Sequence, residues 1–207
     1  MQFQEFAQSV HKAAVKRGLW QGERTIQQII ALIHSQWGAA YTEAQSGRPN
    51  EWHNCTEGDG VTNNPCETTE AYDCAYHSMG KTEQCPYRRK AAQGAFPLLM
   101  DGVMTIMDLL GYMGAQALDQ DTGLSSTMES IVDIGAECAT DDLAGTICLL
   151  HKMTCDVIGY DDGEEDTPSA QTMVEVIALA TGWVKSQGGD PMALLLEKQI
   201  ALLQDQA

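Results

Sequence analysis

The sequence predicts an all-α helical bundle, and three observations support this fold class. Apolar residues recur every three or four positions in one stretch after another, which is the spacing of one helix face. The links between these stretches are short, and no stretch has a convincing strand pattern. Helices that follow one another through short links bury their apolar faces against each other as a bundle.

The clearest predicted helix, about five turns long, lies within residues 25–49, and the rest of the chain is organised around this stretch. Thr25 is of a residue type that caps helix starts, and Gly47 followed by Pro49 is typical of a helix end. We expect a shorter helix before it, over residues 3–17. The apolar stripe of the clearest helix consists of Ile26, Ile29, Ile30, Ile33, Trp37, Ala40 and Ala44.

The remaining predicted helices complete the bundle. A third helix is expected over residues 95–116, with Asp101 and Asp108 on one face because they lie two turns apart. A polar linker follows at residues 117–124, and the acidic run at 161–168 is expected to be a solvated loop. Further helices are expected from a cap at Ser125 or Ser126 to about residue 142, within 146–163, within 172–191, and from Pro191 onward.

Residues 50–94 differ from the helical stretches, because they are rich in Asn, Thr, Gly and Pro and contain four cysteines. These cysteines are Cys55, Cys66, Cys74 and Cys85. Their thiolates, with His53 and His77 as spare nitrogen ligands, are the donor types of a tetrahedral zinc site. Their spacing is irregular and never C-x-x-C, which favours the alternative of free thiols that pack within a loop.

Charge and targeting patterns exclude several classes of function. The chain has 12 Lys and Arg against 29 Asp and Glu, a formal net charge of −17, so sequence-independent binding to nucleic acid is not expected. The N-terminus lacks the pattern of a signal peptide, and no apolar run approaches the ~18 residues of a membrane helix. We therefore expect no membrane segment. Because the seven cysteines are odd in number and the chain is large enough to fold without disulfides, we expect a reduced, cytoplasmic protein.

Residues 11–49, HKAAVKRGLWQGERTIQQIIALIHSQWGAAYTEAQSGRP, resemble the opening of MazG-like nucleoside triphosphate pyrophosphohydrolases. The match has no gap and includes the KRGLW turn, the LIHS of residues 32–35 and the closing GRP. The third predicted helix is similar to the family's third helix, because it keeps both aspartates and the GYMG exit at 111–114. The resemblance implies an all-α fold, cleavage of NTP or dNTP to NMP and pyrophosphate, Mg or Mn as cofactor, and a homo-oligomer.

The resemblance also locates a catalytic metal site, and this site is degenerate. Cleavage requires divalent metals that neutralise the triphosphate, and magnesium prefers carboxylate oxygens. The family has a metal-binding carboxylate at four positions, and at only one of them, Asp101, does this chain have a charged side chain. At a second, Gln36 offers at most a carbonyl oxygen to a metal or to the reaction. Loss of three negative charges removes the main attraction for magnesium. Where the family carries four carboxylates on its second and third helices, this chain has Gln36, Ala39, Leu98 and Asp101.

Further site residues are implied on the nucleotide side. The turn that contains Trp20 helps to wall the nucleotide pocket in the family, although a lone tryptophan more often fills the gap between two helices. Arg24 and Lys198 are the basic residues expected to bind the nucleotide, and Asp108 is a further catalytic position. Glu197 also matches the family, whereas the Tyr, Asn and Arg that the family has after this point are replaced by Ala201, Leu202 and Asp205.

The second half of the chain echoes the first, which indicates two tandem repeats. Residues 146–163 echo the helix at 25–49, with His151 placed as His34 is, and residues 172–191 echo the third helix. One chain would then do the work of a dimer, as an internal pseudo-dimer packed as one unit. The domains would be residues 1–116 with the insertion 50–94, the linker 117–124, and residues 125–207 as the divergent repeat.

If the two repeats pack face to face, their carboxylates could form a metal site at a different place from the degenerate one. This relocated metal site is the alternative prediction. Glu175 stands where Asp101 stands in the first repeat, and Asp156 lies at the other matching place. Together with Asp101, and with Glu43 or Asp108, these carboxylates would build a site for magnesium or manganese.

Three functions follow from these patterns. The favoured one is a nucleotide-binding pseudoenzyme of MazG-like fold, impaired in catalysis because its metal-binding carboxylates are largely replaced. The first alternative is an active NTP or dNTP pyrophosphohydrolase that uses the relocated site. The second is an acidic helical module that binds or regulates a protein partner, with the ten methionines as an adaptable surface.

Overall fold

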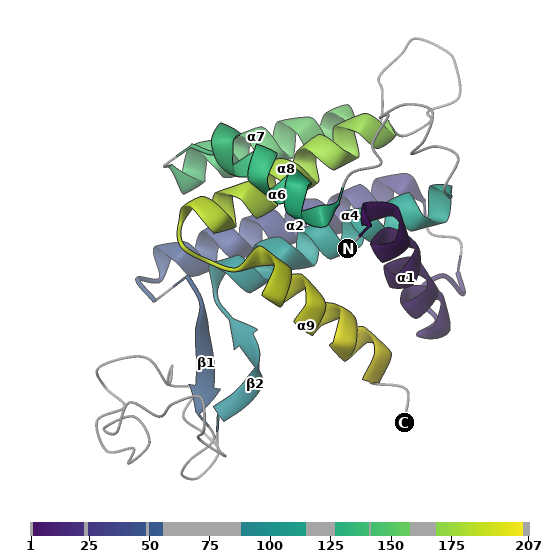
Figure 1. Ribbon diagram of the computed structural model, residues 1–207, viewed down its shortest axis with the longest axis horizontal. Coiled ribbons are helices and arrows are strands. Elements are labelled where there is room, and N and C mark those ends of the chain that lie inside the picture. The colour runs from purple at the N-terminus through teal and green to yellow at the C-terminus, as the bar shows by residue number, and fades with distance from the viewer. Residues whose placement is uncertain are drawn as a thin grey trace.

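The computed structural model describes residues 2–22, 25–48, 50–55, 88–114, 127–140, 142–157 and 169–204. Seven α-helices and one two-stranded sheet lie within these residues (Figure 1). The expected all-α fold class is therefore confirmed. The elements are α1 (Phe3–Lys16), α2 (Ile26–Gln45), β1 (Trp52–Cys55), β2 (Arg88–Gln93), α4 (Ala95–Met113), α6 (Met128–Cys138), α7 (Leu143–Asp156), α8 (Ala170–Ser186) and α9 (Pro191–Gln204).

Local sequence accounts for the boundaries of α2 and α9. Thr25 caps α2 through a capping box: its hydroxyl accepts from the Gln28 N–H, and the Gln28 side chain accepts from the Thr25 N–H. The helix ends at Gln45, shortly before Gly47 with its positive φ of 76°. The helix end expected at Gly47 is therefore confirmed. Helix α9 begins at Pro191, as expected for a residue without an N–H.

The helix expected after the linker is shorter than the sequence indicated. Thr127 caps α6, in place of Ser125 or Ser126, by accepting a hydrogen bond from a backbone N–H in the first turn. Helix α6 ends at Cys138 and does not continue to Asp142. Asp142 instead caps α7, because its carboxylate accepts hydrogen bonds from two of the first backbone N–H groups of that helix.

Helix α4 occupies the centre of the bundle. Helices α1 and α2 pack against α4, and α8 packs against it as well (Figure 1). Helices α6 and α7 pack against α8, so that α6, α7 and α8 repeat the packing order of α1, α2 and α4. Helix α2 also contacts α7, and α9 contacts α1, α4 and α8. Buried core residues of α4 and α8 include Leu99, Met100, Val103, Met107, Ile177 and Trp183.

The apolar composition of α4 follows from this central position. Although no apolar run of membrane-helix length was expected from the sequence, α4 alone among the described helices is long and apolar enough to cross a membrane by length and hydropathy. However, 67% of its most apolar 18-residue window is buried inside the molecule. A helix that is apolar on most of its surface is what the core of a bundle requires.

Glycines let two pairs of helices approach closely. A Cβ atom on Gly135 would lie 1.8 Å from the Ala178 carbonyl oxygen, and one on Gly182 would lie 1.9 Å from the Gly135 carbonyl carbon. Because these contacts are with backbone atoms, α6 and α8 can approach this closely only with glycine at both positions. Gly102 on α4 similarly makes room for Trp37, whose ring would lie 2.5 Å from an added Cβ.

Helices α2 and α7 meet in a seam, here called the α2–α7 seam, formed by His34, Trp37, His151, Thr154 and Cys155. The rings of His34 and His151 stack with centroids 4.8 Å apart, and their Nδ1 atoms lie 2.5 Å from each other. The buried Trp37 donates a hydrogen bond from Nε1 to the Thr154 hydroxyl at 3.2 Å. Both pairs are separated by 117 residues in the chain.

The histidine pair is expected to make the protein less stable in acid. Burial lowers the pKa of His34 and of His151 below the ordinary value of 6.5, and the charge of His151 lowers that of His34 further. Below about pH 6.5 the unfolded chain therefore binds protons that the folded chain does not, so stability falls as the pH decreases. Because both rings are partly exposed, we expect this pair to lower the unfolding midpoint by about 2 °C between pH 7 and pH 5.

Thermal unfolding at the two pH values tests this expectation in the wild type and in the double variant His34→Gln/His151→Gln. The variant has no imidazole to protonate at the seam, so its midpoint should fall about 2 °C less on acidification. An equal fall in both proteins would show that other groups account for the whole acid effect.

A two-stranded antiparallel ribbon stands at the base of the predicted insertion (Figure 1). Strand β1 pairs with β2, and Trp52 lies opposite Gln93. These strands were not predicted, because neither segment alternates polar and apolar residues. His53 and Cys55 lie in β1, but the other candidate zinc ligands lie outside the described residues, so zinc and free thiols both stay predictions. The segments outside the described residues include Cys66, Cys74, Cys85, His77, the linker at 117–124 and the loop at 161–168.

Candidate functional site

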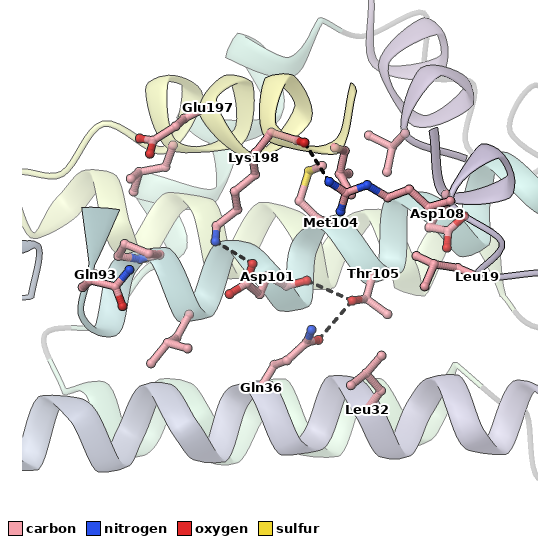
Figure 2. A pocket seen from close by; sticks show the side chains of 18 of the residues that line it. Leu19, Leu32, Gln36, Gln93, Asp101, Met104, Thr105, Asp108, Glu197 and Lys198 are labelled. Atoms are coloured by element: carbon pink, nitrogen blue, oxygen red, sulfur yellow. Dashed lines mark hydrogen bonds and ion pairs between the residues drawn. The ribbon is translucent and has the colours of Figure 1, made fainter. Parts of the chain in front are cut away.

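A cavity of about 520 Å³ lies between α1, α2, α4 and α9, close to the end of β2 (Figure 2). This volume is within the usual range of small-molecule pockets, roughly 300–1,000 Å³. Its apolar lining consists of Val10, Ala14, Leu19, Leu32, Pro97, Leu98, Met104, Leu194, Ala201 and Leu202. Its polar lining consists of Arg17, Gln36, Glu43, Gln93, Asp101, Thr105, Asp108, Glu197 and Lys198.

An ion pair crosses the cavity from α4 to α9. Lys198 on α9 donates from Nζ to Oδ1 of Asp101 on α4, at 2.5 Å (Figure 2). The two residues are 97 positions apart in the chain. Two residues assigned to different roles, a metal ligand and a nucleotide-binding lysine, are therefore bonded to each other.

Gln36 is held by a hydroxyl of the facing helix. The Thr105 Oγ1 lies 3.1 Å from Gln36 Oε1 and 3.0 Å from the Asp101 backbone carbonyl oxygen, and its proton can donate to either (Figure 2). The side-chain oxygen of Gln36, which is the atom that a metal would need, thus faces a hydrogen-bond donor. Leu98, at another position where a carboxylate was expected from the resemblance, contributes only apolar surface.

Basic and acidic groups reach the cavity from several elements. Arg17, just after the end of α1, donates from Nη2 to the Ala201 backbone carbonyl oxygen on α9 at 2.7 Å. Glu43 on α2 accepts from Arg48 Nη1 at 3.3 Å. Two basic side chains, those of Arg17 and Lys198, therefore line the same space as acidic ones.

Asp108 closes the end of the cavity as the centre of an aromatic cluster formed by His11, Trp20 and Tyr112. Its side chain is largely buried and accepts from His11 Nδ1–H at 2.8 Å. The Trp20 indole N–H donates to both carboxylate oxygens at 3.0 Å. Tyr112 stacks on Trp20 with a centroid distance of 4.5 Å. Trp20 does not appear among the cavity-lining residues, so its described contacts fix the turn between α1 and α2.

The relocated metal site is not assembled within the described residues. Asp156 on α7 and Glu175 on α8 are both exposed, and neither lines the cavity that contains Asp101 and Glu43. Glu175 instead accepts a hydrogen bond from Gln171 on its own helix, at 3.0 Å. The inner faces of α7 and α8 carry apolar residues and threonines, which turns these carboxylates to the solvent.

No group of three or more His, Cys, Asp or Glu side chains in the described part of the chain is arranged to hold a metal ion. The described residues do not bring Asp101, Asp156, Glu175 and Glu43 together, and a metal site at these carboxylates stays a prediction. Arg24, the other expected nucleotide-binding residue, lies outside the described residues.

Three residues of this region were missed from the sequence. Arg17 belongs to the KRGLW turn that carries the resemblance, so its place at the end of α1 was a usable signal. Thr105 lies one turn after Asp101 on the same helix face, and helix spacing would have found it. His11 had no such signal, because its partner Asp108 lies 97 residues away.

Comparison of the chain with models of protein families, with curated proteins and with solved structures returns no match.

Proposed function

We propose that the cavity binds a nucleotide and that the protein is a MazG-like pseudoenzyme, impaired in the hydrolysis of nucleoside triphosphates. The positions that the resemblance implies as site residues come from separate helices. Gln36 on α2, Asp101 on α4 and Lys198 on α9 all line the same cavity. This convergence supports the proposal, because the three positions are far apart in the chain and meet only in the folded protein.

The ion pair between Asp101 and Lys198 is the observation that carries the proposal. Asp101 is the last of the four carboxylates that the resemblance implies as metal ligands. Its Oδ1 atom accepts from the Lys198 ammonium, which neutralises the carboxylate without a metal ion. An ammonium cannot lower the pKa of a bound water as a divalent metal does. The cavity is therefore suited to binding and poorly suited to cleavage.

The donor set around Asp101 does not fit magnesium or manganese. Both ions require several oxygen ligands in octahedral array. Leu98 has no donor atom, and the Gln36 oxygen faces the Thr105 hydroxyl. Of the four positions where the resemblance implies carboxylate ligands, only Asp101 has one, and that carboxylate is already paired with Lys198, so these positions lack the negative charge that a divalent cation needs.

A nucleotide suits the mixed lining of the cavity. The apolar walls offer a surface for the base, while Lys198 and Arg17 offer donors for a phosphate group. The phosphate would compete with Asp101 for the Lys198 ammonium. Because Glu43 and Glu197 also line the cavity, each added phosphate increases repulsion in the absence of metal. We therefore expect a nucleoside monophosphate to bind better than the corresponding triphosphate.

The proposal includes an internal pseudo-dimer of two tandem repeats. Helix α6 packs on α8 as α1 packs on α4, and α7 packs on α8 as α2 packs on α4. His34 and His151, which are placed alike in the two predicted repeats, contact each other across the α2–α7 seam. A contact between like positions is what a two-fold axis between the repeats would produce.

Thermal unfolding with a panel of nucleoside mono- and triphosphates, each with and without magnesium, tests the proposal. At ~100-fold over the dissociation constant, a ligand adds about 2.7 kcal/mol to stability. For a protein of this size that corresponds to a midpoint increase of about 5–10 °C. We expect this increase with a monophosphate and no magnesium, and its loss in Lys198→Ala.

The matched control is Lys185→Ala, which removes an exposed lysine of α8 that pairs with Asp133, away from the cavity. Lys185→Ala should keep the full nucleotide effect. Two results would contradict the proposal: no midpoint increase with any nucleotide, or magnesium- or manganese-dependent release of pyrophosphate from a triphosphate.

The alternative of a protein-interaction module has one observation in its favour. Leu196, Ile200 and Leu203 are exposed at helical spacing on α9, on the side turned away from the core. An exposed apolar stripe of this kind is typical of a surface that binds another protein. If no nucleotide binds, this face of α9 is the candidate surface for binding a protein partner.

A further inference from the structure

The α2–α7 seam contains a row of three side chains that the proposed function does not use. The Cys155 Sγ atom lies 3.5 Å from Nε2 of His34, which is hydrogen-bond distance for sulfur. The other ring nitrogen of His34, Nδ1, lies 2.5 Å from Nδ1 of His151. Cys155 is a free, exposed thiol, so one end of this row is open to the solvent.

One arrangement of protons satisfies both contacts. The Cys155 S–H donates to Nε2 of His34, and Nδ1–H of His34 donates to Nδ1 of His151. A thiol, a base and a third group that orients the base are the three parts of an activated nucleophile. Burial, and secondarily the charge of His151, lowers the pKa of His34, so this ring is uncharged at neutral pH and able to accept a proton.

We propose that Cys155 is a nucleophilic thiol, deprotonated by His34 and positioned through His151, that forms mixed disulfides with low-molecular-weight disulfides. Thiolate is the reactive form of cysteine, and a neighbouring base increases its supply. The charge of the resulting imidazolium is stabilised by the hydrogen bond that His34 donates to His151.

The exchange step is balanced by the disulfide alone. The Cys155 proton moves to Nε2 of His34, and the sulfur attacks one sulfur of the small disulfide. A new S–S bond forms to Cys155 while the original S–S bond breaks. The leaving thiolate accepts that proton from His34. One half of the small disulfide is then bonded to the oxidised Cys155, and the other half is released as a thiol.

The same helix supplies an internal comparison. Cys148 is also a free, exposed thiol of α7, two turns before Cys155. No hydrogen bond between Cys148 and a histidine is present in the described part of the structure. Both thiols lie on the same helix, both are exposed, and both are measured in the same sample. The difference between their reaction rates therefore isolates the effect of the histidines.

The test incubates the purified, reduced protein with oxidised glutathione at neutral pH and stops the reaction with acid at intervals. Peptide mass spectrometry then gives the rate of glutathione addition at Cys155 and at Cys148. We expect Cys155 to react at least about 10-fold faster, as a positioned general base provides. His34→Phe should bring the Cys155 rate to that of Cys148, and His151→Phe should lower it by a smaller factor.

A second substitution separates chemistry from loosening of the seam. His34→Gln keeps a polar side chain of similar length but cannot act as a base at neutral pH, so it should slow Cys155 as His34→Phe does. Loosening of α7 would accelerate Cys148 as well, and the ratio of the two rates corrects for it. Equal rates at Cys155 and Cys148 in the wild type, or an unchanged ratio in both His34 variants, would overturn the proposal.

Discussion

Replacing Gly182 by alanine is expected to lower the free energy of unfolding by about 3 kcal/mol, the upper part of the usual range for overpacking. The new Cβ atom would lie 1.9 Å from the Gly135 carbonyl carbon and 2.3 Å from the Ala136 nitrogen. Both are backbone atoms, so no side chain can rotate away to make room. Helix α6 would have to move off α8, and the apolar contacts between these helices would loosen. Urea-induced unfolding of the wild type and the variant measures the change.

Gly38→Ala is the matched control, because it makes the same chemical change within helix α2. A Cβ atom at Gly38 would meet no other atom within 4 Å. Alanine has a higher helix propensity than glycine, so this variant should gain about 0.5–1 kcal/mol. The two variants are thus expected to have opposite signs. A Gly182→Ala variant as stable as the wild type would show that α6 and α8 are not in backbone contact.

Replacing Trp37 by alanine is expected to cost about 4 kcal/mol of stability, as for other fully buried aromatic side chains. The Trp37 side chain is completely buried and packs over Gly102 on α4. Its indole N–H also donates to the Thr154 hydroxyl on α7. One side chain therefore joins three helices, and its removal would leave a cavity between them. The change is measured by the same urea-induced unfolding.

A double-mutant cycle isolates the hydrogen bond of Trp37 from its packing. Thr154→Val removes the acceptor and leaves the buried indole N–H without its partner, which should cost about 1–2 kcal/mol. In the background of Trp37→Phe, which has no indole N–H, the same substitution should cost clearly less. Equal costs in the two backgrounds would contradict the hydrogen bond across the seam.

Much of the fold could be predicted from the sequence, because a helix with one buried face has apolar residues at a spacing of three or four positions. The stripe of Ile26, Ile29 and Ile33 and the cap at Thr25 indicated α2 nearly to its ends. The ribbon of β1 and β2 could not be predicted this way. Its two strands pair across the insertion, and short strands without alternation have no local signal.

The candidate site could also be predicted only in part. The resemblance pointed to Gln36, Asp101 and Lys198, and these residues do line the same cavity. Which of them are bonded to each other was not predictable. Lys198 was expected to meet a nucleotide and instead meets Asp101, since pairing across 97 residues depends on how α9 packs on α4. The same reason explains why Asp156 and Glu175 were expected at a shared site and lie on exposed faces.

The contact between α6 and α8 has a consequence for how the two halves of the chain differ. In the proposed duplication, Gly182 follows Glu175 as Asp108 follows Asp101, so Gly182 and Asp108 are counterparts. Two identical subunits would have to carry the same residue at both places. A single chain is free of that restriction, because each half is encoded separately. One half has a carboxylate at the end of a cavity, and the other has a backbone contact between α6 and α8 at the corresponding position.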